Sequence, residues 1–422
     1  MTALPPLVAA ERCRSCGSDD LAEVIAFGRS PIADRLVRPD DGAEEFAAPL
    51  TLLHCNACAL CQIRETVAPR VLFGPEYPYF SSVSPALQRH FADSARALIA
   101  RLGLGPRDLV VEAASNDGYM LRVFHEAGIP VLGIDPADGP VAVARERGVE
   151  TLHDFFTADC ARRLAAKGRR ARLFLANNVL AHVADVNDFV AGIALMLEAD
   201  GMAVIEAPWL LDLVDSGAFD TIYHQHLLYL SLTALAPLFA RHGLHLNDAE
   251  RVWIHGGSLR LFISRTPGRS ARLEGLLARE AARGVAGTGF YRDFTARIER
   301  LRRETRAALA RLRAQGAVVA GYGAAAKATT LLHHFGLGPD DIAFIVDKSP
   351  WKQGLAMPVT GIPVLPPAAL PERRPDAVLL LAWNFADEII TENAEYLDAG
   401  GRFLVPVPEF REIARNDRRQ TG

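Results

Sequence analysis

One stretch, from Leu109 to Pro136, limits the fold of this chain more than any other part of the sequence. An apolar run is followed by a short polar loop at 115–118, then by an amphipathic segment and a second apolar run. This order predicts a strand–loop–helix–strand unit, the building block of a parallel sheet that is covered by helices. Glu112 and Asp135 place an acid near the end of each predicted strand, at the sheet edge where ligands bind.

The polar loop also indicates which ligand that edge would hold. A dinucleotide site needs several glycines and bare backbone amides for its pyrophosphate, but this loop has one glycine, Gly118, and the acid Asp117, with Glu112 just before it. Two carboxylates would repel a diphosphate but tolerate the ammonium and sulfonium groups of S-adenosylmethionine (SAM), and Asp135 can bond a ribose. The pattern therefore predicts a SAM site; the alternative is a structural loop with acids there by chance. The expected contacts are Glu112, Ser115, Asn116, Asp117, Gly118, Asp135, Pro136, Asn177 and Asn178.

The size and charge of the chain argue against several classes of protein. With 422 residues, 50% of them hydrophobic, two or three ordinary globular domains are expected. The formal net charge of −4 argues against a protein whose task is to neutralise nucleic-acid phosphates. No run of about 18 apolar residues occurs, and the first residues have neither a basic nor an apolar segment. We therefore expect a cytoplasmic protein that binds neither nucleic acid nor a membrane, and the sequence is compatible with a monomer.

Two Cys-x-x-Cys pairs, Cys13 with Cys16 and Cys55 with Cys58, predict a metal site. Each pair can aim two thiolates at one tetrahedral zinc ion. Four thiolates leave no coordination position for chemistry, so the predicted zinc ion is structural. Reduced thiols or disulfides are the alternatives.

The chain divides into three predicted domains of an α/β protein. Residues 1–66 contain both cysteine pairs and no long periodic helix, which predicts a small zinc-binding domain. In residues 67–265 strands alternate with helices, which predicts a parallel sheet in a central, Rossmann-like domain that contains the predicted SAM site. Residues 266–422 are expected to form a helical connection and a second Rossmann-like domain. The predicted strands of the last two domains are 109–113, 131–135, 173–177, 202–206, 317–320, 342–347, 377–381 and 403–406.

A glycine-rich loop begins the predicted C-terminal domain. It runs from Gly321 through Tyr322 and Gly323 to Ala326 and Lys327, directly after a predicted strand. Close glycines and a small alanine let the backbone approach a ligand, the start of a helix favours an anion, and the lysine adds a positive charge. The loop therefore predicts a phosphate-bearing ligand, with tight packing as the alternative reason for its glycines.

A cluster of acid–base side chains lies between the two predicted nucleotide-type domains. Tyr223, His224, Gln225 and His226 are consecutive, and His182 follows the third strand of the central domain. Histidine exchanges protons near neutral pH, and a tyrosine hydroxyl can donate to a developing oxyanion. A helix-capping or core cluster is the alternative for these residues.

These motifs together resemble the nucleotide-sugar C-methyltransferases of deoxysugar and antibiotic biosynthesis, over nearly the whole chain. The resemblance implies a zinc domain, a SAM domain and a Rossmann-like C-terminal domain, with the sugar nucleotide held between the last two. It further implies methylation at C-3 of a TDP-linked 4-keto-deoxysugar. The segments that carry it are both cysteine pairs, Val111–Gly118, Ala176–His182, Tyr223–His226, His255–Arg260 and Gly321–Lys327.

The resemblance also suggests roles for the clustered residues. His226 is the expected base, with Tyr223 and His182 at the ketone or in a proton relay and Gln225 completing the catalytic set. Gln225 stands where the family's segment has a glutamate, and an amide cannot hold an imidazolium by its charge. The expected contacts to the sugar nucleotide are His224, for which a structural role is also open, His255, Gly256, Ser258, Arg260, Tyr322 and Lys327.

Two other functions compete with a sugar C-methyltransferase. One is a protein that binds or isomerises a sugar nucleotide and retains SAM without methyl transfer, since Gln225 alters the catalytic set. The other is a zinc-bearing RNA or protein methyltransferase, which would not need the loop 321–327 and should show a basic face.

Overall fold

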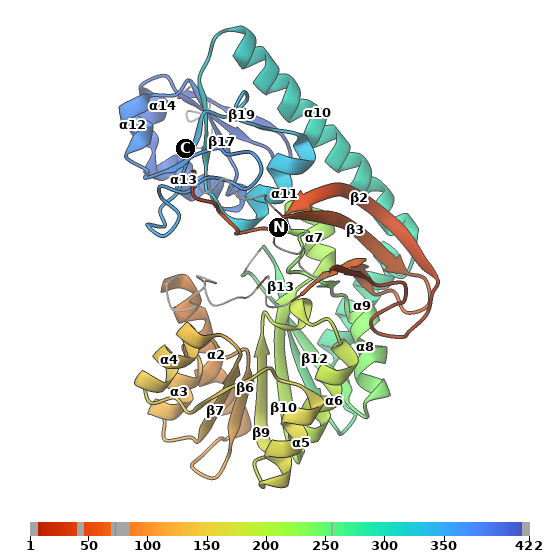
Figure 1. The fold of residues 1–422 in the computed structure, drawn as a ribbon. Helices are drawn as coiled ribbons and strands as arrows, with labels where there is room; N and C mark the ends of the chain where they lie inside the picture. Colours follow the sequence, from red (N-terminus) through yellow and green to blue (C-terminus); the bar gives the residue numbers. More distant parts are fainter. Residues whose placement is uncertain (1–6, 40–45, 69–71, 73–84, 255, 416–422) are drawn as a thin grey trace.

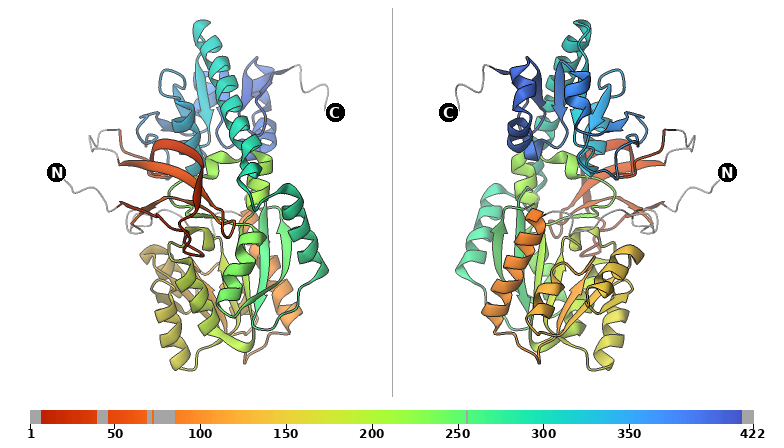
Figure 2. Two further views of the ribbon diagram at one scale, coloured as in Figure 1. Left: turned by 90° about the vertical axis from the view of Figure 1, so that its right-hand side faces the viewer. Right: turned by 90° about the vertical axis from the view of Figure 1, so that its left-hand side faces the viewer.

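The computed structural model describes residues 7–39, 46–68, 72, 85–254 and 256–415, and it confirms an α/β protein with three parts (Figure 1). The central domain and the C-terminal domain each contain a large sheet, and the long strands β2 and β3 of the N-terminal domain lie beside both (Figures 1 and 2). Within the described ranges no helix is both long and apolar enough to span a membrane.

The N-terminal domain is built from antiparallel strands around the cysteine pairs. A four-stranded sheet has the order β11–β4–β3–β2, and β1 pairs with β5. Strand β11 (Leu228–Tyr229) comes from the central domain and follows the Tyr223–His226 segment directly. The segment is therefore joined to the N-terminal sheet by strand pairing. The bounds are β1 Leu7–Ala9, β2 Leu21–Pro31, β3 Ala47–Cys55, β4 Cys61–Ile63 and β5 Glu65–Val67.

The central domain has a seven-stranded sheet in the order β12–β13–β10–β9–β6–β7–β8. The five strands from β10 to β8 are parallel, as predicted, and alternate residues of each strand face different helices. Val110 packs in one core with α2 and α3, and Val111 packs in another with α5 and α6. The bounds are α2 Pro85–Leu102, β6 Val110–Ala113, α3 Leu121–Glu126, β7 Val131–Asp135, α4 Asp138–Glu146, β8 Thr151–His153, α5 Ala158–Ala166, β9 Ala171–Asn177, η2 Leu180–His182, α6 Val186–Met196, β10 Leu197–Pro208, α7 Leu210–Ser216, η3 Phe219–Thr221, α8 Leu232–Arg241, β12 His245–Val252 and β13 Ser258–Ser264.

The central sheet differs from the prediction at one edge. Strand β13 runs antiparallel to both β10 and β12, so the sheet is mixed rather than wholly parallel. The connection between β12 and β13 is only five residues, 253–257, and a parallel pair would need a crossover of a dozen or more residues.

The C-terminal domain has a six-stranded sheet in the order β16–β15–β14–β17–β18–β19, parallel except for β19. The predicted helical connection is confirmed: the long helix α10 buries Phe294, Ile298, Leu301 and Leu312, which recur at helical spacing. Helix α11 packs on β2 and η3, so all three domains meet at this helix. The bounds are α9 Ala271–Arg283, η4 Thr288–Tyr291, α10 Arg292–Ala314, β14 Val319–Tyr322, α11 Ala326–Phe335, β15 Phe344–Val346, β16 Val364–Leu365, α12 Ala369–Arg373, β17 Ala377–Leu380, η5 Trp383–Phe385, α13 Ala386–Glu392, α14 Ala394–Asp398, β18 Arg402–Val405 and β19 Arg411–Ile413.

Candidate active site

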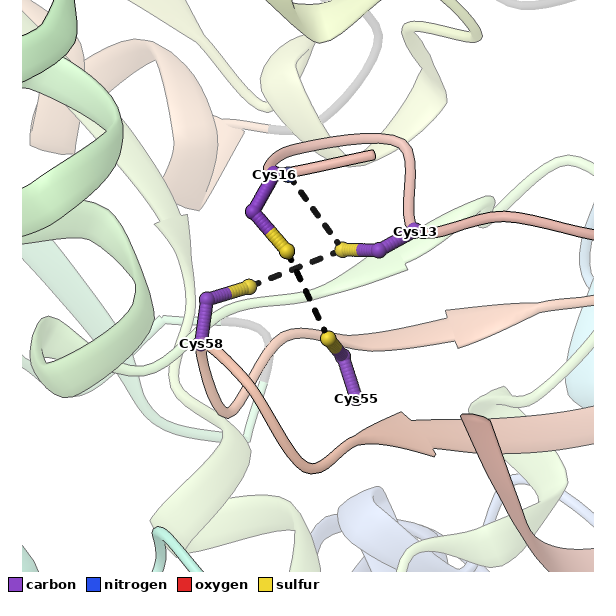
Figure 3. Close-up of side chains that lie close together, drawn as sticks. All are labelled: Cys13, Cys16, Cys55 and Cys58. Atoms are coloured by element: carbon purple, nitrogen blue, oxygen red, sulfur yellow. Dashed lines mark hydrogen bonds between the residues drawn. The ribbon is translucent and has the colours of Figure 1, made fainter. Parts of the chain in front are cut away.

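The four cysteines of the two predicted pairs come together in the N-terminal domain (Figure 3). Their sulfur atoms all lie within 4.8 Å of one another, with 3.5 Å between Cys13 and Cys58 and 3.6 Å between Cys16 and Cys55. Thiolates bound to one tetrahedral zinc ion at about 2.3 Å lie about 3.8 Å apart. The donor set and spacing therefore fit a closed zinc site. Cys61 and Cys160 are buried outside this cluster.

The loop after β6 is held by the acid at the tip of β7. The two carboxylate oxygens of Asp135 accept hydrogen bonds from the backbone N–H groups of Asn116 and Ala137, each at 2.9 Å. Gly133 leaves the space that Ser115 fills, because a Cβ atom there would lie 2.4 Å from the Ser115 hydroxyl oxygen. Burial raises the pKa of Asp135 above its ordinary value. Asp135 therefore positions the loop and faces the predicted SAM site at the carboxyl edge of the sheet.

Glu112 is fully buried at that edge. Its Oε1 accepts a hydrogen bond of 3.0 Å from the Asn177 side chain, and within the described residues Oε2 has no hydrogen-bond partner. Burial raises the pKa of Glu112 to about 8, and the nearby carboxylates of Asp135 and Asp117 add to the shift. An orphaned, buried carboxylate oxygen at this edge fits the cationic ammonium group of SAM.

The other predicted SAM contacts are also at the carboxyl edge of the sheet, with different surroundings. Asp117 is buried and pairs with Arg147 at 2.9 Å, so part of its charge is already balanced. Gly118 adopts a φ of 72°, and a side chain there would press on Val149. Pro136 accepts a hydrogen bond through its carbonyl from His153. The backbone N–H of Asn178 donates to the Glu206 carbonyl, and within the described residues its buried side-chain oxygen has no partner.

Two residues at this edge were not predicted from the sequence. Glu206, at the end of β10, is fully buried and accepts hydrogen bonds from His90 at 2.8 Å and from Arg260 at 3.0 Å. Its place at the end of a predicted strand was a signal that could have identified it. His90 lies on α2, far away in sequence, and no local pattern pointed to it. Arg260, predicted to contact the substrate, thus pairs with a carboxylate beside the predicted SAM site.

Tyr223, His226 and His182 form one cluster, as predicted. The hydroxyl of Tyr223 lies 3.1 Å from Nε2 of His226, and the two rings are 4.2 Å apart. The ring of His182 lies 4.9 Å from that of His226. Burial lowers the pKa of His182, which favours a neutral imidazole. The structure therefore brings together one phenol and two imidazoles.

Backbone carbonyl groups orient both imidazoles. Nδ1 of His226 lies 2.9 Å from the Thr221 carbonyl oxygen, and Nδ1 of His182 lies 2.6 Å from that of Gln225. A carbonyl oxygen only accepts hydrogen bonds, so each Nδ1 carries a proton. In the neutral form Nε2 of His226 is then the nitrogen with a lone pair, and it accepts the bond from Tyr223.

Gln225 and His224 point to the N-terminal domain instead. The Gln225 amide donates a hydrogen bond of 2.7 Å to the Ala33 carbonyl, and Nε2 of His224 donates to the Pro49 carbonyl at 2.9 Å. Both side chains are buried. Their contacts are to backbone groups of β3 and of the turn after β2, which favours the structural role for His224.

The loop after β14 repeats the arrangement of the first loop. The two oxygens of Asp347 accept hydrogen bonds from the backbone N–H groups of Ala324 at 2.7 Å and Ser349 at 2.8 Å. Gly323 has a φ of 95°, and a Cβ atom there would lie 2.5 Å from that of Ala382. Tyr322 is buried and packs in the core of the C-terminal domain.

Lys327 is half-buried at the start of α11. Its ammonium group lies 4.1 Å above the ring of Trp383 and donates a hydrogen bond to Asn384. Burial lowers the pKa of Lys327 to about 8, and the carboxylate of Asp220 opposes that shift. The lysine therefore already has protein partners beside the glycine-rich loop after β14.

The remaining predicted contacts lie around the connection 253–257. Gly256 has a φ of 85° and open space beside it, whereas Ser258 is buried and donates to the Ile254 carbonyl. His255 lies outside the described residues.

Comparisons with known proteins agree with this architecture. Family models match a zinc binding domain at residues 13–73, a methyltransferase domain at 87–248 and a C-methyltransferase C-terminal domain at 253–408. They agree with the two predicted cofactors: SAM in the central domain and a structural zinc ion on the four cysteines.

Among relatives, C-methyltransferase NovU from Streptomyces niveus is 39% identical over 96% of this chain and 97% of its own length. A ubiquinone biosynthesis O-methyltransferase from Azorhizobium caulinodans is 31% identical over 29% of this chain and 47% of its own length. A solved magnesium protoporphyrin IX methyltransferase from Synechocystis is 16% identical, with a TM-score of 0.34 over 44% of this chain and 88% of its own. By its full-length similarity to NovU, this chain belongs to the C-methyltransferase family.

Proposed function

We propose that this SAM-dependent C-methyltransferase acts at C-3 of a TDP-linked 4-keto-deoxysugar, through an enolate that a histidine base generates. The observation that carries the proposal is the fixed tautomer of His226, whose Nδ1 is bonded to the Thr221 carbonyl. A carbon nucleophile must be made by removing a C–H proton, and such a proton is acidic only beside a group that accepts the charge. A ketone at C-4 is such a group for a proton on C-3.

The base in this proposal is Nε2 of His226. It removes the C-3 proton, the electrons of the C–H bond move toward O-4, and Nδ1 keeps its bond to Thr221. The imidazolium that forms is stabilised by that carbonyl. SAM, when bound, supplies the electrophilic methyl group for the carbon nucleophile.

Tyr223 is placed to assist at the ketone. Its hydroxyl donates to Nε2 of His226 in this structure and can turn that hydrogen bond toward O-4 when the base takes up a proton. His182, with its neutral ring 4.9 Å from that of His226, is the second candidate for proton relay. Lys327 and the loop after β14 would bind the diphosphate of the nucleotide.

Gln225 contributes through hydrogen bonds in this proposal. Its side-chain amide donates to the Ala33 carbonyl, and its backbone carbonyl oxygen accepts from His182. A glutamate side chain would direct a carboxylate at the Ala33 carbonyl oxygen, with no proton to share. The glutamine therefore fits the local acceptor that the N-terminal domain presents.

Deuterium exchange at C-3 tests the base directly. A TDP-4-keto-6-deoxy sugar incubated in heavy water with the protein should exchange its C-3 proton, and addition of SAM should give a product one methyl group heavier by mass spectrometry. His226→Asn should abolish both, while the matched variant His125→Asn, at an exposed histidine in the last turn of α3, should retain both. Exchange at the wild-type rate in His226→Asn would show that the base is another group, with His182 the next to test.

The same assay separates the rival function. A protein that binds or isomerises sugar nucleotides without methyl transfer would exchange the C-3 proton and show no mass gain with SAM.

A further inference from the structure

The segment that carries the proposed base is linked to the C-terminal domain by contacts that neither the motif nor the family match explains. Asp220, in η3, is fully buried, and its Oδ2 accepts a hydrogen bond of 2.6 Å from the indole N–H of Trp383 in η5. Within the described residues its other oxygen has no hydrogen-bond partner. A buried carboxylate with a single hydrogen bond and one nearby cation, Lys327, is costly, so a structural packing role alone would be better served by an apolar residue.

A second link lies two residues further along. The hydroxyl of Thr330, on α11, donates a hydrogen bond of 2.9 Å to the Ile222 carbonyl. Phe219, at the start of the same segment, stacks on Phe335 of α11 with 5.2 Å between the ring centres. The C-terminal domain therefore contacts the segment at three successive places.

These links surround one functional atom. Asp220 and Ile222 are the two neighbours of Thr221, whose carbonyl oxygen accepts from Nδ1 of His226. The direction of that carbonyl follows from the backbone angles of the residues on either side of it. A change at either link would turn the carbonyl away and release the His226 tautomer.

We propose that Trp383, Asp220 and Thr330 are positioning residues, through which the C-terminal domain holds the Thr221 carbonyl and thereby fixes His226 as a base at Nε2. The inference rests on the proposed function in assigning His226 as the base. It extends that function because Trp383 and Thr330 belong to the domain that carries the phosphate-type loop. Lys327, the residue proposed to contact the diphosphate, lies over the Trp383 ring and therefore next to the Trp383–Asp220 hydrogen bond.

The tautomer of His226 can be measured without any substrate. Long-range proton–nitrogen NMR on protein with ¹⁵N-labelled histidines distinguishes a ring protonated at Nδ1 from one protonated at Nε2, and His226→Asn identifies the signal. In the wild type we expect Nδ1–H. In Trp383→Phe, which keeps the ring and loses the N–H donor, we expect a mixture of tautomers.

Kinetics provide the second readout. C-3 exchange in Trp383→Phe should fall about ten- to hundredfold in kcat, with KM for the TDP-keto sugar and SAM affinity within about twofold of wild type. The matched controls are Trp351→Phe, an exposed tryptophan of the same domain, and Asp215→Asn, which pairs with Arg283 near the same segment. Both controls should leave the tautomer and kcat unchanged.

The outcomes separate the two claims. An unchanged Nδ1–H tautomer in Trp383→Phe would overturn the inference, whatever happens to the activity. A mixed tautomer with an unchanged exchange rate would support the positioning role and contradict His226 as the base. If Trp383→Phe does not fold, Thr330→Val, which removes the neighbouring link and keeps the side-chain shape, carries the same test with the same expected results.

Discussion

The central and C-terminal domains hold a ligand-type loop in the same way, through an aspartate that accepts backbone hydrogen bonds, but the charged side chains around the two loops differ. In each domain an aspartate at the end of the second strand accepts two backbone hydrogen bonds. One comes from the loop after the first strand, and the other comes from the residue two positions after the aspartate itself. Asp135 does this in the central domain and Asp347 in the C-terminal domain. In each loop the residue whose N–H bonds the neighbouring strand has a positive φ, Ala114 in one and Gly323 in the other.

The strand register shows where the two loops diverge. Glu112 pairs with the residue two positions before Asp135, and Gly321 pairs with the residue two positions before Asp347. A buried carboxylate in the central domain thus corresponds to a glycine in the C-terminal domain, where Lys327 follows instead. This difference is the basis for our proposal that the same backbone arrangement binds a cationic ligand in one domain and an anionic ligand in the other. Removing or reversing these charges tests that difference.

The largest effect is expected from loss of the zinc ion, which would detach the N-terminal domain from the Tyr223–His226 segment. Cys55→Ser should lower zinc from one ion per chain to none by elemental analysis, because a structural zinc site contributes on the order of 10 kcal/mol to folding. Methyl transfer should be lost, since Ala33 and Pro49 would no longer support the Tyr223–His226 segment. SAM binding should survive in soluble protein, because the central sheet has its own core. Full zinc content in Cys55→Ser, with Cys160→Ser as control, would refute the site.

A pH-dependent effect on stability should follow from Glu112. Its pKa is raised from the ordinary 4.5 to about 8, so the folded protein keeps a proton that the unfolded chain loses. The free energy of unfolding of the SAM-free protein should therefore fall as the pH rises from about 4.5 and level off above about 8. Denaturant unfolding of Glu112→Gln should lack this contribution. An identical pH profile in wild type and Glu112→Gln would mean that Glu112 is ionised in the folded state.

Substitution of Asp135 and of Asp347 should weaken the binding of different ligands. Asp135→Asn should weaken SAM binding by about 1.5 to 3 kcal/mol, the usual value of hydrogen bonds to a charged group, and leave TDP binding unchanged. Asp347→Asn should weaken TDP binding by a similar amount and leave SAM binding unchanged. Calorimetry with each ligand on each variant measures all four values. If one variant weakens both ligands equally, the loops are not separate sites.

The smallest effect is expected at Lys327, which already has protein partners. Lys327→Gln should weaken TDP binding about tenfold, or ~1.4 kcal/mol. In the wild type TDP affinity should fall as the pH rises through about 8, because the lysine then loses its charge. The variant should bind weakly but without that fall. Equal TDP affinity in both proteins would make the lysine a scaffold residue only.

Local sequence signals predicted much of this molecule. Apolar runs predicted four strands of each large sheet, but β8, β12, β13, β16 and β19 were not predicted. The spacing of the cysteines predicted a cluster that the structure confirms. The grouping of Tyr223, His226 and His182 was also predicted, because two of them are close in sequence and the third follows a strand at the same sheet edge.

Contacts between distant segments could not be predicted. His90 meets Glu206 across 116 positions, and Asp220 meets Trp383 across 163. Each pair joins side chains from elements that only the tertiary fold brings together. The partner of Gln225 is a backbone carbonyl of another domain, which no residue pattern encodes.

Simultaneous binding of two ligands tests the central claim most directly. Calorimetric titration of SAM into protein saturated with TDP, and of TDP into protein saturated with SAM, should give one of each ligand per chain, with neither affinity lowered by the other ligand. That result would establish a cation-type and an anion-type site on the same backbone frame. Mutual displacement of SAM and TDP would show a single shared site and contradict the account.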